Sequence, residues 1–231
     1  MTIRMVPGFL PSTSGFRFAN SFPKVPLRWI GIPGVVSLGV GDASNGLCGG
    51  MVFGARDHFE AGVPIPHATT APSEGPLFEY LVDRLFDSFQ LPNGPARYLR
   101  LMNPLLSDGE TVWSRLGIAP HGRTWRIVHE EWPKVRAEID AGHPAALGLV
   151  RIRSADPLDL KHNHQVLAYG YRLEDSALTL HLYDPNRPGD DDVRLSMDLA
   201  DANRRPTTVP ASRPVLSLFR VGYSPSIPPP T

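Results

Sequence analysis

The sequence predicts an α+β fold in which helices come first and strands follow. Before Gly142, apolar residues recur at intervals of three and four, which is the period of a helix buried on one face. After Gly142 they alternate with polar residues or form short runs, as strands do. Helices and strands that are segregated in this way favour an antiparallel sheet over parallel βαβ units. The length of 231 residues suits one domain, and a hydrophobic content of 42% is enough for a sizeable core.

Four helices are expected in the first part of the chain. Each has an apolar stripe, and a glycine or proline marks its beginning or end. They are a helix from Cys48 to the stop at Gly62, one over 77–89, one over 108–116, and one with Pro133 in its first turn and Gly142 just past its end.

Strands are expected over 145–152, 165–173, 178–182, 192–199 and 215–223. Residues 1–40 are rich in Pro, Gly, Phe and Ser and have no sustained period, which predicts an extended arm packed through aromatic residues such as Phe16, Phe18 and Trp29. The Pro-rich residues 224–231 are expected to be a disordered or polyproline-like tail.

Composition argues against several classes of partner. The 23 basic and 23 acidic residues cancel, so the chain has no net field to attract nucleic acid or a membrane surface. No apolar run approaches the roughly 20 residues that a membrane-spanning helix needs. Cys48 is the single cysteine, which leaves no internal disulfide, and Pro7 and Pro11 interrupt any signal-peptide core. A cytoplasmic protein is expected, and the sequence does not indicate its oligomeric state.

No cofactor is expected from the motifs. The segment Gly39-Val40-Gly41-Asp42-Ala43-Ser44 imitates a dinucleotide-binding loop, but Ser44 replaces its third glycine. A calcium loop beginning at Asp184 fails because Pro188 and Leu195 stand where ligands are needed.

A reactive thiol is the first candidate for chemistry. The predicted helix places Cys48 at its N-terminus, where free N–H groups and the helix dipole favour an anion. Such a setting can lower a cysteine pKa from about 8.5 to roughly 3.5–7.5. Gly46, Gly49 and Gly50 leave the thiol uncovered. The alternative is that Cys48 is only a small buried hydrophobic residue.

A base and an orienting group follow in the strand half. His164 begins one predicted strand and Asp184 ends the next, so an antiparallel hairpin brings them together although they are twenty positions apart. Nucleophilic attack on a carbonyl needs a nucleophile, a base and a group that orients the base. Asp184 is favoured as the orienting group because it is nearest the strand end, with Asn186 as the alternative.

These residues carry a resemblance to the papain-like cysteine peptidase superfamily, and most closely to its bacterial C39-like, bacteriocin-processing branch. The matching motifs are Gly46-Leu47-Cys48-Gly49-Gly50-Met51, His164-Gln165-Val166-Leu167-Ala168-Tyr169-Gly170-Tyr171 and Tyr183-Asp184-Pro185-Asn186. The resemblance implies a helical lobe over 41–142 packed on an antiparallel β lobe over 143–223, together forming one domain over 41–223. It also implies that Cys48 is the nucleophile, His164 the base and Asp184 the orienting acid.

One position departs from the family pattern. Such enzymes carry a Gln six residues before the cysteine as an oxyanion donor, and this position is Asp42 here. A carboxylate would repel an oxyanion, so Asn45 is the candidate donor.

The expected activity is hydrolysis of an amide or thioester through a Cys48 acyl-enzyme, with a peptide or a small amide or acyl compound as substrate. Peptidase, deamidase and acyltransferase chemistry all remain open. One alternative is an inactive papain-like binding module whose groove is lined by Tyr169, Tyr171 and Trp residues. Another is a metal protein built on His162, His164 and Asp184, since alternate residues of a strand face the same side.

Overall fold

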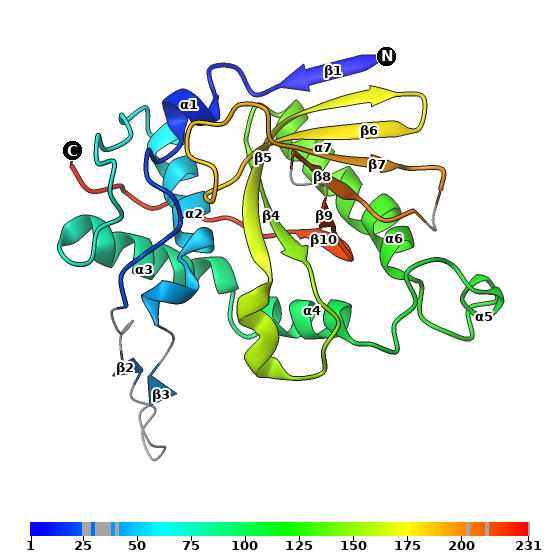
Figure 1. The fold of residues 1–231 in the computed structure, drawn as a ribbon. Coiled ribbons are helices and arrows are strands. Elements are labelled where there is room, and N and C mark those ends of the chain that lie inside the picture. The colour runs from blue at the N-terminus through cyan, green and yellow to red at the C-terminus, as the bar shows by residue number, and fades with distance from the viewer. Residues whose placement is uncertain (25–28, 31–37, 40–41, 202–203, 211–212, 231) are drawn as a thin grey trace.

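The computed structural model describes residues 1–24, 29–30, 38–39, 42–201, 204–210 and 213–230 (Figure 1). Within these ranges, seven α-helices accompany an eight-stranded antiparallel sheet. The mixed class and the order of helices before strands are confirmed for most of the chain. The exceptions lie near the N-terminus, where β1 (Thr2–Met5) and the pair β2 (Trp29–Ile30) and β3 (Leu38–Gly39) precede the long helices.

Two long helices pack closely in the first half. The expectations for α2 (Cys48–Glu60) and α3 (Pro76–Phe89) are confirmed. The apolar stripe of α3 includes the buried Leu81 and Leu85, and α2 lies against it. A Cβ built on Gly50 would lie 2.0 Å from the carbonyl oxygen of Leu81, so the absence of a side chain there lets the two helices approach.

The helix expected over 108–116 is wrong in extent. Only α5 (Val112–Arg115) is helical, and it begins where Thr111 and Ser114 form a reciprocal capping box. The preceding loop has other hydrogen-bond partners, since the carbonyl of Asp108 accepts from Thr124 N–H and the carboxylate of Glu110 accepts from Gly122 N–H.

One helix was not expected. α4 (Asn93–Met102) begins with Asn-Gly-Pro, which is typical of a turn, so its start is hidden in the sequence. The expected helix around Pro133 is confirmed as α7 (Trp132–Asp140). It continues from α6 (Arg123–Arg126) through a π-helical turn over Ile127–Glu131.

All five expected strands are present, and the sheet order is β10-β4-β5-β6-β7-β8-β9. Every pairing is antiparallel, and β1 pairs with the outer half of β5 beyond the end of β4. The bounds are β4 (Ala145–Val150), β5 (His164–Glu174), β6 (Ala177–Tyr183), β7 (Arg194–Asp198), β8 (Thr207–Val209), β9 (Arg213–Pro214) and β10 (Ser217–Arg220).

The central strand β5 receives helices that position the site. Both α2 and α7 pack against it, and β4 is buried along its whole length. Because β5 is buried from His164 to Tyr171, its buried residues after Gln165 are aliphatic, aromatic or glycine and show no strict alternation with polar ones. The first residue of β5 therefore lies beside the first turn of α2, where Cys48 is found.

The first 24 residues of the expected arm are part of this body. β1 extends the sheet, and a short helix α1 (Pro11–Ser14) follows. The ring of Phe9 packs 5.1 Å from that of Phe59 on α2 and 5.4 Å from that of Tyr169 on β5. Phe16 and Phe18 are buried as expected, whereas the side chain of Trp29 lies outside the described residues.

The start of the tail is also bonded to the body. The Ser224 carbonyl accepts a 2.7 Å hydrogen bond from Arg84, and Ser226 N–H donates to the buried carboxylate of Asp57 at 3.0 Å. This stretch has neither helix nor strand, but these bonds hold it onto α2 and α3. None of the helices in the described ranges combines the length and apolar character needed to cross a membrane.

Candidate active site

Cys48 is the first residue of α2, as the sequence predicts. Leu47 precedes it as the N-cap. The first hydrogen bond of the helix runs from Met51 N–H to the Leu47 carbonyl at 2.9 Å. The cysteine is half-buried. Hydrogen bonding from the backbone N–H groups of Gly49 and Gln165 helps to lower the pKa of its thiol. These donors stabilise a negative charge on sulfur.

His164 and Asp184 meet as the hairpin argument expects. The imidazole Nε2 lies 2.6 Å from Asp184 Oδ1. Since Nε2 faces the carboxylate, Nδ1 is the ring nitrogen left to interact with the Cys48 thiol, whose pKa His164 lowers. The structure therefore brings Cys48, His164 and Asp184 into one chain of contacts.

Asn186 also lies beside the His164 imidazole, but its role differs from that of Asp184. Its Nδ2 is 3.2 Å from His164 Nε2, and its backbone N–H donates to Asp184 Oδ1 at 2.9 Å. A 2.6 Å contact to a carboxylate requires the proton on Nε2, and that proton cannot be shared with an amide nitrogen. Asp184 is therefore the acceptor, and Asn186 holds the carboxylate in place through its main chain.

The surroundings favour a charged pair of thiolate and imidazolium. Burial disfavours the thiolate, but the hydrogen bond and charge of His164, with the two N–H groups, outweigh it and lower the pKa of Cys48. Burial likewise opposes the imidazolium, yet Asp184 and Cys48 raise the pKa of His164 to about 9. Burial would raise the pKa of Asp184, but the bond from His164 holds it below its ordinary value.

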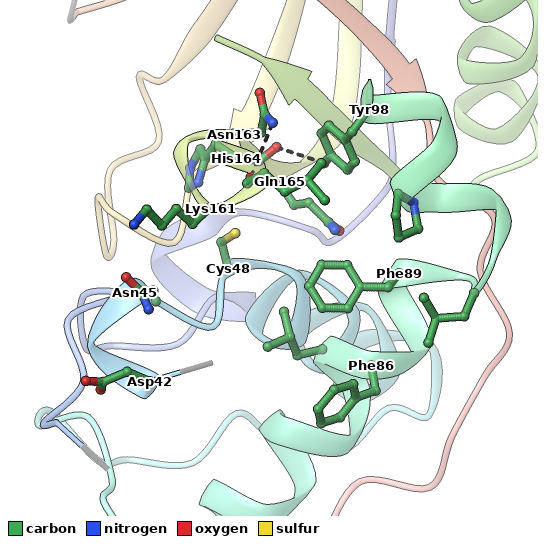
Figure 2. Close-up of a pocket in the computed structure, with 15 residues that line it drawn as sticks. Asp42, Asn45, Cys48, Phe86, Phe89, Tyr98, Lys161, Asn163, His164 and Gln165 are labelled. Atoms are coloured by element: carbon green, nitrogen blue, oxygen red, sulfur yellow. Dashed lines mark hydrogen bonds between the residues drawn. The ribbon is translucent and has the colours of Figure 1, made fainter. Parts of the chain in front are cut away.

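An apolar pocket of about 410 Å³ opens beside the thiol (Figure 2). In Figure 2 the sulfur points into the space between the His164 side and the ring of Phe89. Asp42 and Asn45 line this space from the turn before Cys48, and Lys161 lines it from beside His164. The apolar wall consists of Leu85, Phe86, Phe89, Leu91, Pro95, Tyr98 and Leu160.

Asp42 and Asn45 both line the pocket, at opposite ends of one short turn. The carboxylate of Asp42 accepts Ser44 N–H at 2.9 Å and so caps the 3₁₀ turn Ala43–Asn45. That N–H, more than any other group, lowers the pKa of Asp42. Asn45 is exposed at the pocket, as a donor to an oxyanion must be.

His162 does not share a strand with His164, and that prediction is wrong. Asp156 caps the Leu158 N–H and Pro157 opens a 3₁₀ helix over Pro157–His162, so the chain turns before β5 begins. The His162 ring is exposed and lies 3.6 Å from Asp159. In the part of the chain that the structure describes, no three His, Cys, Asp or Glu side chains are grouped to hold a metal ion.

The groove expected from Tyr169 and Tyr171 is also wrong. Each side chain is 1% exposed, because the first eight residues of β5 are buried on both faces. Their hydroxyl groups bond the Asp191 carbonyl and the Asp140 carboxylate. They belong to the core.

Two site residues were not singled out from the sequence. Gln165 is buried, and its amide nitrogen donates to Ser88 on α3 at 3.2 Å. A Cβ on Gly49 would lie 2.1 Å from the Ser88 oxygen and 3.0 Å from the Gln165 nitrogen, so this contact needs the glycine. The second, Asn20, joins the turn before Cys48 to the loop of Asp184. In the sequence, Asn20 could have been noticed because it is the polar residue in a series of alternate positions whose other members, 16, 18 and 22, are phenylalanine.

Comparisons with protein-family models, with curated proteins and with solved structures find no match for this chain.

Proposed function

We propose that this protein is a thiol hydrolase that cleaves an amide or thioester through an acyl-enzyme on Cys48. The observation that carries the proposal is the chain of contacts from the Cys48 thiol through the His164 imidazole to the Asp184 carboxylate. A partly exposed thiol at a helix N-terminus, a buried base and a partly buried acid are the parts that nucleophilic catalysis requires. Helices that contribute the thiol and strands that contribute the base would then form the two lobes of a papain-like arrangement.

The reaction follows from the charges. The Cys48 thiolate attacks the carbonyl carbon, and the Cys48 N–H and Asn45 stabilise the resulting oxyanion. The His164 imidazolium donates its Nδ1 proton to the leaving nitrogen or sulfur as that bond breaks, leaving a thioester on Cys48. His164 then takes a proton from water, the water oxygen attacks the thioester, and the acid leaves as the thiolate is restored. An amine in place of water would give acyl transfer.

The pocket supports an apolar acyl group. Its wall is aliphatic and aromatic on the α3 and α4 side, and Cys48 stands at its edge. Burying apolar groups is worth about 25 cal/mol per Å², so an aliphatic or aromatic acyl chain would bind there with its carbonyl at the thiol. Peptides with an apolar residue at the cleaved carbonyl, and fatty or aromatic amides and thioesters, share this chemistry.

Trapping of the acyl-enzyme tests the proposal. The protein is mixed with thioesters and activated esters of apolar acids, quenched in acid and weighed intact. The wild type is expected to gain one acyl group on Cys48 that hydroxylamine removes, and Cys48→Ala is expected to gain none. Acylation that persists in Cys48→Ala, or that proceeds at the same rate in His164→Ala, would contradict the proposal.

A further inference from the structure

A polar side chain interrupts a row of buried aromatic residues in the N-terminal segment. Phe16, Phe18 and Phe22 are at most 5% exposed, whereas Arg17, Ala19 and Ser21 are exposed. Asn20 occupies the same alternation and is partly buried. Its amide therefore points toward the body of the protein, as the rings of the neighbouring phenylalanines do.

The contacts of Asn20 join the two sides of the candidate active site. Its Oδ1 accepts the N–H of Leu47, the residue before Cys48, at 2.6 Å. Its Nδ2 donates to Asn186 Oδ1 at 3.2 Å, and its backbone N–H donates to the Pro185 carbonyl at 2.8 Å. Pro185 and Asn186 directly follow Asp184, whose carboxylate the Asn186 N–H holds.

Gly46 makes room for this amide. A Cβ at Gly46 would lie 2.5 Å from Asn20 Nδ2 and 2.9 Å from its Oδ1. The same glycine has a φ of 90°, a conformation that side chains disfavour. The turn before Cys48 is thus shaped so that the Asn20 amide reaches the Leu47 N–H.

We propose that Asn20 is a positioning residue that sets the separation between the Cys48 thiol and the His164–Asp184 pair. The inference rests on the proposed function, because the separation matters only if thiol and imidazole act together. Hydrogen bonds such as these fix the positions of the groups they join, and a misplacement of about 1 Å in a reacting group can lower a rate roughly a hundredfold. The N-terminal segment is then part of the catalytic apparatus.

Because Asn20 is uncharged, its replacement can change the ionisation of the Cys48 thiol only through the geometry of the site. The charged and titratable side chains around the thiol and its partners come from β5, the Asp184 loop, α4, the end of β4 and the pocket rim. They are His164, Asp184, Tyr98, Arg151, Lys161 and Asp42. Replacing Asn20 by alanine changes none of these charges. A change in thiol ionisation would therefore report a change in geometry.

The experiment measures the rate of Cys48 alkylation by iodoacetamide as a function of pH in the wild type and in Asn20→Ala. The midpoint of the profile is expected to rise by about one pH unit in Asn20→Ala, so that alkylation at pH 6 slows about tenfold. The matched control is Ser12→Ala, which removes the 2.7 Å bond from the same N-terminal segment to Asp191 but touches no site residue. Its midpoint is expected to equal that of the wild type.

The outcomes separate the two proposals. A low midpoint in the wild type that is unchanged in Asn20→Ala overturns the positioning role and leaves the proposed function standing. A wild-type midpoint near that of a free thiol overturns the proposed function, and the positioning role with it. If circular dichroism shows that Asn20→Ala is unfolded, Asn20→Leu decides by the same criterion. Leucine has a similar size, adds no charge and makes neither of the two side-chain hydrogen bonds, so its midpoint is also expected to rise.

Discussion

His164 Nε2 and Asp184 Oδ1 lie 2.6 Å apart although twenty positions separate them in the chain. The hairpin of β5 and β6 produces this contact, since antiparallel pairing of Leu167 with Tyr183 returns the end of β6 to the start of β5. The two side chains are only 3% and 14% exposed, so water competes little with the bond.

Asp184→Asn is expected to lower kcat/KM for a thioester or activated ester by roughly a hundredfold, the range in which positioned acid–base groups act. Asparagine fills the same space, but without the charge it no longer holds the pKa of His164 at about 9. Steady-state kinetics at pH 7.5 measure the effect. The control is Asp191→Asn, farther along the same β6–β7 connection, which should keep wild-type kinetics. Wild-type kinetics in Asp184→Asn would contradict the orienting role.

Alkylation and turnover are expected to differ in alkaline solution. Alkylation needs only the thiolate, so its rate should rise through the lowered pKa of Cys48 and then stay level. Turnover also needs the imidazolium as acid, so it should fall as pH passes the His164 pKa of about 9. Parallel pH profiles of the two rates check this. Turnover that stays level above pH 10 would show that His164 is not the proton donor.

The apolar pocket is expected to select long acyl chains. Compared with acetate, hexanoate adds four methylene groups, each worth up to about 0.8 kcal/mol when buried, so its 4-nitrophenyl ester should be cleaved at least about tenfold faster in kcat/KM. Leu91→Asp puts a charge at the rim and should remove this preference while sparing acetate. Leu105→Asp is the control, because Leu105 is also exposed and lies outside the pocket. If Leu91→Asp kept the wild-type preference for hexanoate over acetate, the acyl chain would not bind in this pocket.

Gly50→Ala is expected to destabilise the fold by about 3 kcal/mol, near the upper end for overpacking, because its Cβ would overlap the Leu81 carbonyl. Gly54→Ala, one turn along α2, meets only Phe16 and Tyr80 side-chain atoms at 3.2 Å and should stay within about 1 kcal/mol of the wild type. Urea unfolding of both variants compares them. Equal free energies of unfolding for Gly50→Ala and Gly54→Ala would mean that α2 and α3 do not pack closely at Gly50 and Leu81.

Local patterns predict the parts of this fold that depend on periodicity. The stripe of α3 and the alternation in β6 repeat over several residues, and a glycine follows α2 as a stop signal. All three elements are present. α4 was missed because its first turn consists of turn-forming residues. β1 was missed because its four residues are exposed and owe their conformation to pairing with β5.

The same distinction holds at the site. Cys48, His164 and Asp184 were identified because each stands at the predicted end of an element, where topology alone brings them together. The contacts of Asn20 with Leu47 and Asn186 join segments 27 and 166 positions apart, and no local period records such a contact. His162 was misplaced because a 3₁₀ turn and a strand start look alike over three residues.

The rate of Cys48 alkylation at pH 6, compared between the wild type and His164→Ala, tests the central claim most directly. If the imidazole holds the thiol ionised, iodoacetamide should modify the wild type at least about tenfold faster than a free thiol, and His164→Ala should fall to the free-thiol rate. A wild-type rate equal to that of a free thiol, unchanged by His164→Ala, would contradict the account.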